Sequence, residues 1–95
     1  MTAYAIVGEN IHDQAMFDAY RKDVLATLAP FKGEFAVRGG AFTVLEGEFP
    51  YQRLVVLAFA SRADAEGWYK SDAYQKLLPL RLKSTTGVFV IVDGV

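Results

Sequence analysis

Arg38 and Glu46 are the charged residues whose places in the sequence best fit an interior chemical role. Arg38 ends an apolar segment and directly precedes Gly39-Gly40, so its side chain can point into the interior. A guanidinium is planar and matches a carboxylate with paired N–H donors. Glu46 follows Thr43-Val44-Leu45, and burial there would raise its carboxyl pKa toward that of a general base. The structural alternatives are an Arg38–Glu46 ion pair, or a solvated strand end for Glu46.

A second group of candidates lies on the helical stretch that follows residue 61. Trp68, Tyr69 and Tyr74 form an aromatic cluster, and such clusters can wall a ligand pocket. At helical spacing, aromatic residues also form ordinary core in which a hydroxyl is tethered by a hydrogen bond. Arg81 either contributes to the ligand site or ties its helix to a strand end. We therefore predict a ligand-binding role for the three aromatic residues and Arg81, with core packing as the alternative.

The composition argues against several classes of site and partner. The 95 residues contain no cysteine and one histidine, His12, and the net charge is −1. Zinc and iron sites use thiolate and imidazole ligands, so we expect no metal and no cofactor. His12 is either a proton shuttle or an exposed turn residue. Basic stripes, signal peptides and long apolar runs are absent, which predicts a cytoplasmic protein without nucleic-acid or membrane partners.

The elements that would position these residues follow from the apolar pattern. Leu54 to Ala60 is an unbroken apolar run, typical of a strand that is buried on both faces. Shorter runs predict strands at 4–9 and 88–92, and apolar residues at helical spacing predict a helix over 14–29. Two further helical stretches, 62–70 and 73–83, follow the central strand. Asp13, Ser61 and Ser71 are the predicted N-caps.

The segment 35–44 has strand character on both sides of Gly39-Gly40. A glycine pair there is either a tight hairpin or a kink within one long strand. A hairpin would reverse the direction of the central strand, so we favour the kinked strand. The element order is then βαββαβ. It predicts one α+β domain over 1–95, a ferredoxin-like antiparallel sheet with both helices on one face.

The other face of this sheet needs a cover as well. The strands at 4–7, 54–60 and 88–92 are apolar on both faces, whereas two helices cover only one. Soluble monomers rarely expose a contiguous apolar patch of that size. We therefore predict a homodimer through the second sheet face. The alternative is a cover made by the chain's own loop and C-terminus.

Several short motifs together resemble the family called domain of unknown function 1330. The resemblance spans essentially the whole chain and rests on the order and spacing of Arg38-Gly39-Gly40, Glu46-Gly47, Trp68-Tyr69 with Ser71 and Tyr74, Pro79-Leu80-Arg81, and Asp93-Gly94. It implies a dimeric α/β barrel, in agreement with the fold predicted from the pattern. It implies no established reaction.

Three hypotheses for the function remain open. The favoured one is a small homodimer that binds an acidic or aromatic organic molecule in a cleft near the sheet interior. The second is a cofactor-free enzyme, either a proton-transfer isomerase or a monooxygenase, in which Glu46 or His12 shuttles a proton and Arg38 holds substrate charge. The third is a structural or interaction module. Burial of Arg38 and Glu46 in a cavity would favour the first two.

Overall fold

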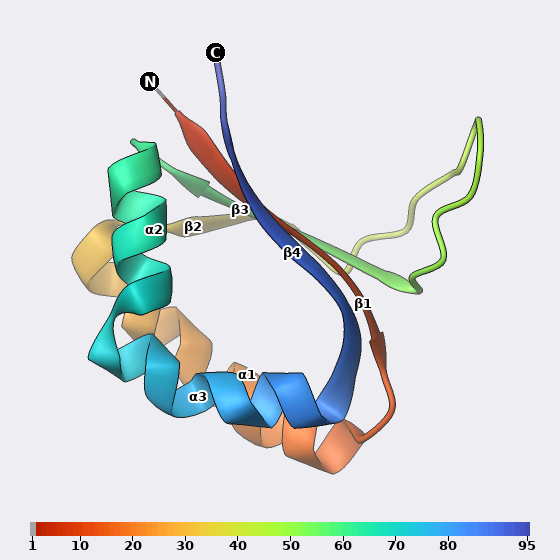
Figure 1. Cartoon of the computed structure of the whole chain (residues 1–95), viewed down its shortest axis with the longest axis horizontal. Helices are drawn as coiled ribbons and strands as arrows, with labels where there is room; N and C mark the ends of the chain where they lie inside the picture. Colours follow the sequence, from red (N-terminus) through yellow and green to blue (C-terminus); the bar gives the residue numbers. More distant parts are fainter. Residues whose placement is uncertain (1) are drawn as a thin grey trace.

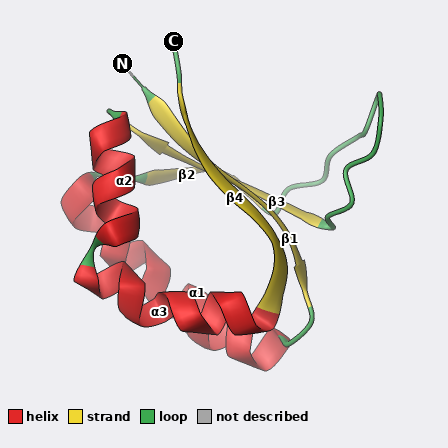
Figure 2. Cartoon of the chain, in the orientation of Figure 1, coloured by secondary structure: helices red, strands yellow, loops and turns green. Residues whose placement is uncertain are grey.

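The computed structural model describes residues 2–95 and contains one sheet and one helical layer (Figures 1 and 2). Its elements in chain order are β1 (Ala3–Ile11), α1 (Gln14–Leu28), a 3-10 turn η1 (Ala29–Phe31), β2 (Glu34–Arg38), β3 (Arg53–Phe59), α2 (Arg62–Lys70), α3 (Asp72–Ser84) and β4 (Thr85–Asp93). The predicted βαββαβ order is therefore confirmed, with the second helical element split into α2 and α3.

The sheet is antiparallel, with strand order β2-β3-β1-β4. The helices lie on one face of it, as Figure 1 shows. This is the predicted ferredoxin-like arrangement. β1 and β3 are the two inner strands, and their register pairs Val7 with Val55 and Glu9 with Arg53. The register brings residues that are more than forty positions apart in the sequence directly opposite one another.

Side chains cap the three helices at the predicted positions. Asp13 Oδ1 accepts a hydrogen bond from the Met16 amide at 3.0 Å, and Ser61 Oγ accepts one from the Asp64 amide at 3.1 Å. Ser71 Oγ accepts one from the Tyr74 amide at 3.3 Å and so separates α2 from α3. Each cap satisfies an amide that has no partner within its own helix, which fixes where that helix begins.

The hydrophobic core lies between the helices and the face of the sheet that they cover. Because side chains alternate along a strand, every second residue of β1 and β3 points into it. The buried core residues are Ala5, Val7, Phe17, Tyr20, Val24, Leu28, Val55, Leu57, Phe59, Ala65, Trp68 and Tyr74. Three helices of modest length are held in place mainly by this shared burial.

The segment around Gly39-Gly40 differs from the predicted kinked strand. β2 ends at Arg38, and residues 39–52 form no strand. Gly39 has a φ of 72°, a left-handed conformation that glycine adopts easily, and its amide donates to the carbonyl of Leu54 at 3.0 Å. The irregularity in the β2–β3 ladder lies earlier, between Phe35 and Val37. A β-bulge at that place changes which face the following residues occupy.

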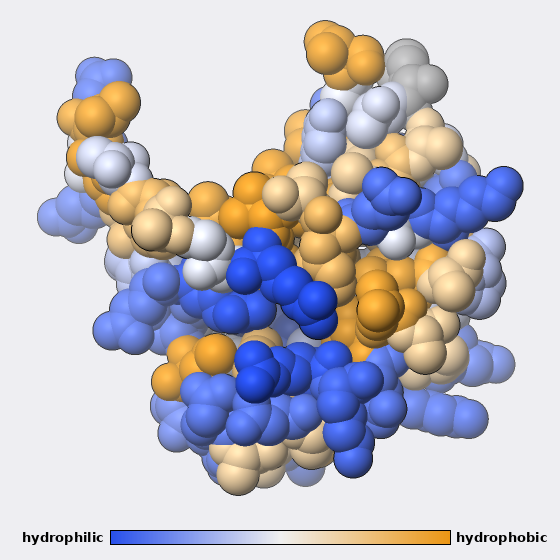
Figure 3. All heavy atoms as spheres, turned by 180° about the vertical axis from the view of Figure 1, so that it is seen from behind, coloured by the Kyte–Doolittle hydropathy of each residue, from blue (hydrophilic) through white to orange (hydrophobic). Residues whose placement is uncertain are grey.

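Residues 39–52 leave the sheet as an arm, visible at the upper right of Figure 1 and the upper left of Figure 3. Near its end, Phe49 and Tyr51 pack over Gly8, where a Cβ would meet the Tyr51 ring at 2.8 Å. The arm thus covers one end of the second sheet face. The outward residues of β4, by contrast, are open: Val88, Val90 and Val92 are 48%, 50% and 44% exposed. Within residues 2–95, no helix is long and apolar enough to cross a membrane.

Candidate functional site

A cavity of about 160 Å³ lies between the helices and the covered face of the sheet. It is close in size to the ~150 Å³ cavity that can hold a benzene molecule. Its apolar wall consists of Val7, Phe17, Val24, Phe35, Val55, Leu57, Trp68 and Phe89. Its polar and charged residues are Glu9, Tyr20, Arg21, Arg38, Arg53 and Arg81. The cavity can therefore surround one ring-sized apolar group and present charge to it.

Glu9 is the carboxylate that lines this cavity. The strand places it on the same side as Ala5 and Val7, and it is 3% exposed. Its Oε2 accepts a hydrogen bond from Nε of Arg53 at 3.2 Å, whereas its Oε1 is buried without a partner. Burial raises the pKa of Glu9 above its usual range, although Arg53 and Arg81 lower it. A carboxylate of this kind is suited to exchange a proton with a bound molecule.

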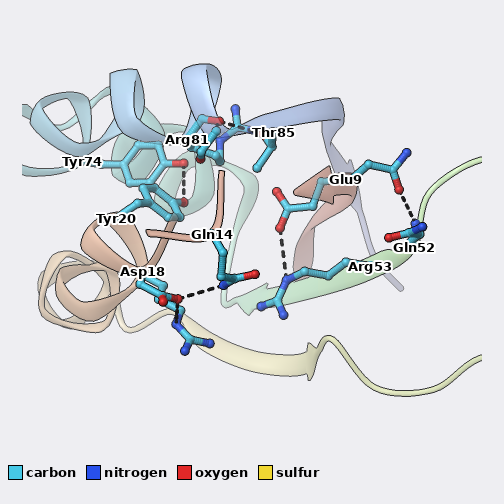
Figure 4. A network of polar contacts seen from close by, with 12 residues as sticks. Glu9, Gln14, Asp18, Tyr20, Gln52, Arg53, Tyr74, Arg81 and Thr85 are labelled. Carbon is cyan, nitrogen blue, oxygen red and sulfur yellow. Dashed lines mark hydrogen bonds and ion pairs between the residues drawn. The ribbon is translucent and has the colours of Figure 1, made fainter. Parts of the chain in front are cut away.

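Arg81 lies on the last turn of α3 and is 6% exposed. Its Cζ is 5.1 Å from the centre of the Phe89 ring, and its Nε is buried without a hydrogen-bond partner. The carbonyl of the same residue accepts a hydrogen bond from Thr85 Oγ1 at 2.7 Å. The backbone is thus fixed while one donor of the buried guanidinium stays unused. Figure 4 shows Glu9 between Arg53 on one side and Tyr20 and Arg81 on the other.

Tyr20 and Tyr74 form a buried hydroxyl pair behind the charged residues, with their oxygens 2.9 Å apart. Burial raises the pKa of both hydroxyls. Tyr74 raises the pKa of Tyr20 further, whereas the hydrogen bond with Tyr20 lowers the pKa of Tyr74. The two phenols therefore stay neutral at physiological pH and act as hydrogen-bonding groups rather than as bases. Tyr20 lines the cavity; Tyr74 is fully buried and positions Tyr20.

Arg38 and Arg53 approach the cavity from the sheet. Arg38 lies with its Cζ 4.2 Å from the centre of the Phe35 ring, and Arg53 lies with its Cζ 5.4 Å from that of Phe17. The bulge in β2 explains how Phe35 and Arg38, three residues apart, both line the cavity. A Cβ at Gly39 would lie 2.6 Å from a terminal nitrogen of Arg53, so glycine at this position leaves room for that guanidinium.

The charge around the cavity is predominantly positive. Four arginines line it against one carboxylate, Glu9. Arg21 is also paired with Asp18 at 3.1 Å, whereas no ion pair joins Arg38 or Arg81 to an acid within residues 2–95. In Figure 3, strongly hydrophilic residues lie beside apolar ones in the middle of the molecule. Such a site favours anions with an apolar body.

The structure brings some of the predicted site residues to this cavity and leaves others away from it. Arg38, Arg81 and Trp68 line it, and Tyr74 supports it through Tyr20. Trp68 is held by a hydrogen bond from Nε1 to Thr27 Oγ1 at 3.0 Å. Tyr69 packs against Phe89, with ring centres 5.1 Å apart, and is not part of the lining.

Glu46 and His12 lie outside the cavity. Glu46 is exposed on the arm, where no strand forms, and it borders only a shallow surface hollow with Phe42 and Leu45. His12 is exposed in the turn after β1, and its amide donates to the carbonyl of Ser84 at 2.9 Å. Neither residue therefore belongs to the candidate site, and Glu9 takes the place that Glu46 was predicted to fill.

Sequence reasoning missed Glu9, Tyr20 and the central position of Arg53. The signal available for Glu9 was its place in the strand alternation. Residues 5, 7 and 9 of one strand share a face, and the first two of them are apolar core residues. Nothing in the local sequence pairs Glu9 with Arg53, 44 residues away. Residues 2–95 contain no cluster of three histidine, cysteine or acidic side chains placed to hold a metal ion.

Comparison with known proteins identifies the family. The model of the family described as Domain of unknown function (DUF1330) matches residues 2–95, and the chain belongs to this family. No functionally curated protein is similar enough in sequence to count as a relative. The predicted resemblance is confirmed, while the family description carries no activity.

Solved structures with the same fold have little sequence in common with this chain. A Rhodopseudomonas palustris protein of unknown function has a TM-score of 0.78 at 10% identity, over 99% of this chain and 82% of the other. A dimeric ferredoxin-like protein of unknown function from Jannaschia sp. has a TM-score of 0.73 at 16% identity, over 99% and 100%. SnoaB, a cofactor-independent oxygenase from Streptomyces nogalater, has a TM-score of 0.65 at 10% identity, over 99% and 93%. At these identities the similarity shows a common fold.

Proposed function

We propose that this protein binds a small organic anion, with a single ring or an apolar body of similar size, in the cavity between helices and sheet. The observation that carries the proposal is the convergence of four arginines and one carboxylate on an otherwise apolar cavity. Of the charged residues that line the cavity, Glu9 and Arg81 are buried, whereas Arg21 and Arg38 are exposed. Buried ions lose their hydration, and a bound anion would offset that loss for Arg81. A bound carboxylate would reduce the excess positive charge of the cavity lining.

The arginines have distinct places in this proposal. Arg53 donates its Nε to Glu9, so its terminal nitrogens remain for the ligand, and Arg38 approaches from the neighbouring strand. Together they would hold the carboxylate, because guanidinium groups bind it with paired hydrogen bonds. The rings of Phe17, Phe35 and Phe89 would pack against the body of the ligand.

A thermal-shift comparison of benzoate with benzamide and benzyl alcohol tests the proposal. The three molecules share a ring, and only benzoate carries a charge. We expect benzoate, or another small aromatic acid, to stabilise the wild type; a ligand at one hundred times its Kd contributes ~2.7 kcal/mol. Arg38→Gln and Arg53→Gln should reduce this shift.

Arg62→Gln is the matched control, because Arg62 is a half-exposed arginine on α2 that pairs with Glu66 and Asp93. It should bind the acid as the wild type does. If no small acid shifts the unfolding temperature of the wild type, or if Arg38→Gln responds fully, the binding proposal is wrong. A structural or interaction role would then explain the packing of these residues better.

We also propose that two chains associate through the second sheet face. The support is the row Val88, Val90 and Val92 on β4, about half-exposed and side by side with the outward residues of β1. Two copies stacked on this face would remove the row from water in a closed two-fold dimer. Similar solved structures include proteins described as dimeric.

An enzymatic role is the second candidate function. SnoaB, which has the same fold, is described as a cofactor-independent oxygenase. For this chain the specific observation is Glu9, a buried carboxylate that lines the cavity with one oxygen unbonded.

A further inference from the structure

Two polar atoms of the cavity have no partner, and they are chemically complementary. Glu9 Oε1 is a buried acceptor and Arg81 Nε is a buried donor, and they are the buried side-chain atoms left unbonded within residues 2–95. Both residues line the same cavity. Unpaired buried polar groups are rare and costly. Two of them in one cavity therefore point to a ligand that both accepts and donates.

We propose that Glu9 and Arg81 form a proton-transfer site for a carbonyl-containing organic acid, in which Glu9 is the base and Arg81 stabilises the enolate oxygen. This inference rests on the proposed binding of an organic anion in the same cavity. The ligand carboxylate lies with Arg38 and Arg53, and the carbonyl lies toward Arg81. A carbon beside the carbonyl then faces Glu9.

The reaction moves one proton and needs no second reactant. Glu9 Oε1 takes the proton from the carbon next to the carbonyl; the C–H bond breaks and an O–H bond forms on Glu9. The electron pair of that bond becomes part of an enolate whose negative oxygen accepts a hydrogen bond from Arg81. Glu9 returns the proton to the same carbon or to another carbon of the delocalised anion. Atoms and electrons balance, and the net change is an exchange or an isomerisation.

The surrounding residues suit this division of roles. Burial and the low polarity of the aromatic wall raise the pKa of Glu9, and a base whose pKa is nearer to the working pH transfers protons more efficiently. Tyr20 stays neutral because burial raises its pKa, so Glu9 is the group of the cavity lining that can act as the base. The positive charges of Arg53 and Arg81 lower the pKa of Glu9 and so favour its ionised form.

The test follows hydrogen–deuterium exchange by NMR, with 2-oxobutanoate and phenylpyruvate as probes in D2O. The carbon beside the keto group of each probe loses its proton signal when it is deuterated. We expect the wild type to accelerate exchange by about a hundredfold or more over buffer, a typical contribution of a positioned base. Glu9→Gln should abolish the acceleration, since an amide cannot accept the proton. Glu66→Gln, which changes a half-exposed acid on α2, is the matched control and should exchange as the wild type does.

Binding of each probe is measured in parallel by thermal shift, which separates the two proposals. A probe that stabilises the wild type and exchanges at the buffer rate overturns proton transfer and leaves binding intact. If neither probe stabilises the wild type, binding of oxo acids fails, and proton transfer falls with it. Exchange by Glu9→Gln at the wild-type rate also overturns the inference.

The pH profile of the wild type gives a test that does not depend on the folding of a variant. The rate of exchange should rise with pH through a single ionisation that lies above the ordinary range of a glutamate pKa, because the carboxylate form is the base and burial raises its pKa. A profile that is flat or that follows the buffer would contradict a role for Glu9.

Discussion

The two faces of the sheet are built from the same strands and have opposite characters. On the covered face, β1 contributes Val7 and Glu9 to a cavity that also contains arginine and tyrosine side chains. On the other face, β4 presents Val88, Val90 and Val92 to solvent. Alternation along a strand assigns each residue to one face.

The difference between the faces indicates that each face of this small domain has its own role. Buried charged side chains on the covered face lose hydration free energy unless a ligand or partner pairs with them, which favours a chemical role there. Exposed apolar side chains on the open face are unfavourable in water unless a second surface covers them, which favours association. The predictions below test this division, starting with the largest expected effect.

Neighbouring substitutions on β4 should separate the two faces most clearly. Ile91 packs against the core, whereas Val90 is 50% exposed on the open face. Ile91→Asp places a charge among apolar groups and should cost more than about 3 kcal/mol, a large part of a domain's stability of ~5–15 kcal/mol. Val90→Asp should remain folded and become monomeric. Urea unfolding followed by circular dichroism measures the first effect, and light scattering after size exclusion measures the second.

All samples in this comparison need the same chain concentration, because association stabilises a folded dimer by mass action. The molar mass of the wild type measured by light scattering should be twice that of one chain. A wild-type monomer, or a Val90→Asp variant that stays dimeric, would refute association through this face.

The hydroxyl pair of Tyr20 and Tyr74 should show that the interior polar groups depend on one another. Tyr20→Phe or Tyr74→Phe leaves the remaining buried hydroxyl without its 2.9 Å partner, and each should cost about 1–3 kcal/mol. The double variant should cost less than the sum, because it removes both hydroxyls together. Unfolding free energies of the four proteins give the coupling. Strict additivity would mean that the two hydroxyls act independently.

The pH dependence of the free energy of unfolding should show that the pKa of Glu9 is raised by burial. Because its pKa is raised in the folded protein above the ordinary value of 4.5, the folded state binds more protons than the unfolded state between these two pKa values. The free energy of unfolding then falls as pH rises through this interval. The stability of the wild type relative to Glu9→Gln should therefore decrease from pH 4.5 upward, as urea unfolding at several pH values can measure.

Glu66→Gln is the matched control on the surface. Glu66 is about half-exposed and lies 3.5 Å from Arg62, an exposed pair of the type that contributes less than ~1 kcal/mol. Its substitution should change stability little at any pH. A relative stability of Glu9→Gln that moves in the opposite direction with pH would show that the arginines, rather than burial, control Glu9.

Much of the fold could be predicted because its signals are local. The apolar run at 54–60 marks an inner strand, and Asp13, Ser61 and Ser71 mark the beginnings of the helices. The error at residues 40–44 has a physical cause. The apolar residues there resemble a strand, but the left-handed Gly39 turns the chain away from the sheet, so no neighbouring strand is available to pair with them.

The candidate site was much less predictable than the fold. Arg38, Trp68 and Arg81 were predicted and do line the cavity. Glu46 was favoured as the acid because it follows an apolar segment, yet it lies on the exposed arm. The acid that lines the cavity is Glu9, whose neighbours in the sequence give no sign of an arginine partner.

The sequence by itself determined the order of the elements, the apolar character of both sheet faces and the family. Those properties depend on periodicity and on residues close together in the chain. Only the tertiary structure decided which charges meet, because the register of β1 with β3 places Glu9 opposite Arg53 and the bulge in β2 brings Arg38 to the same side. Register and bulges depend on contacts between distant segments, so the site exists only in the folded chain.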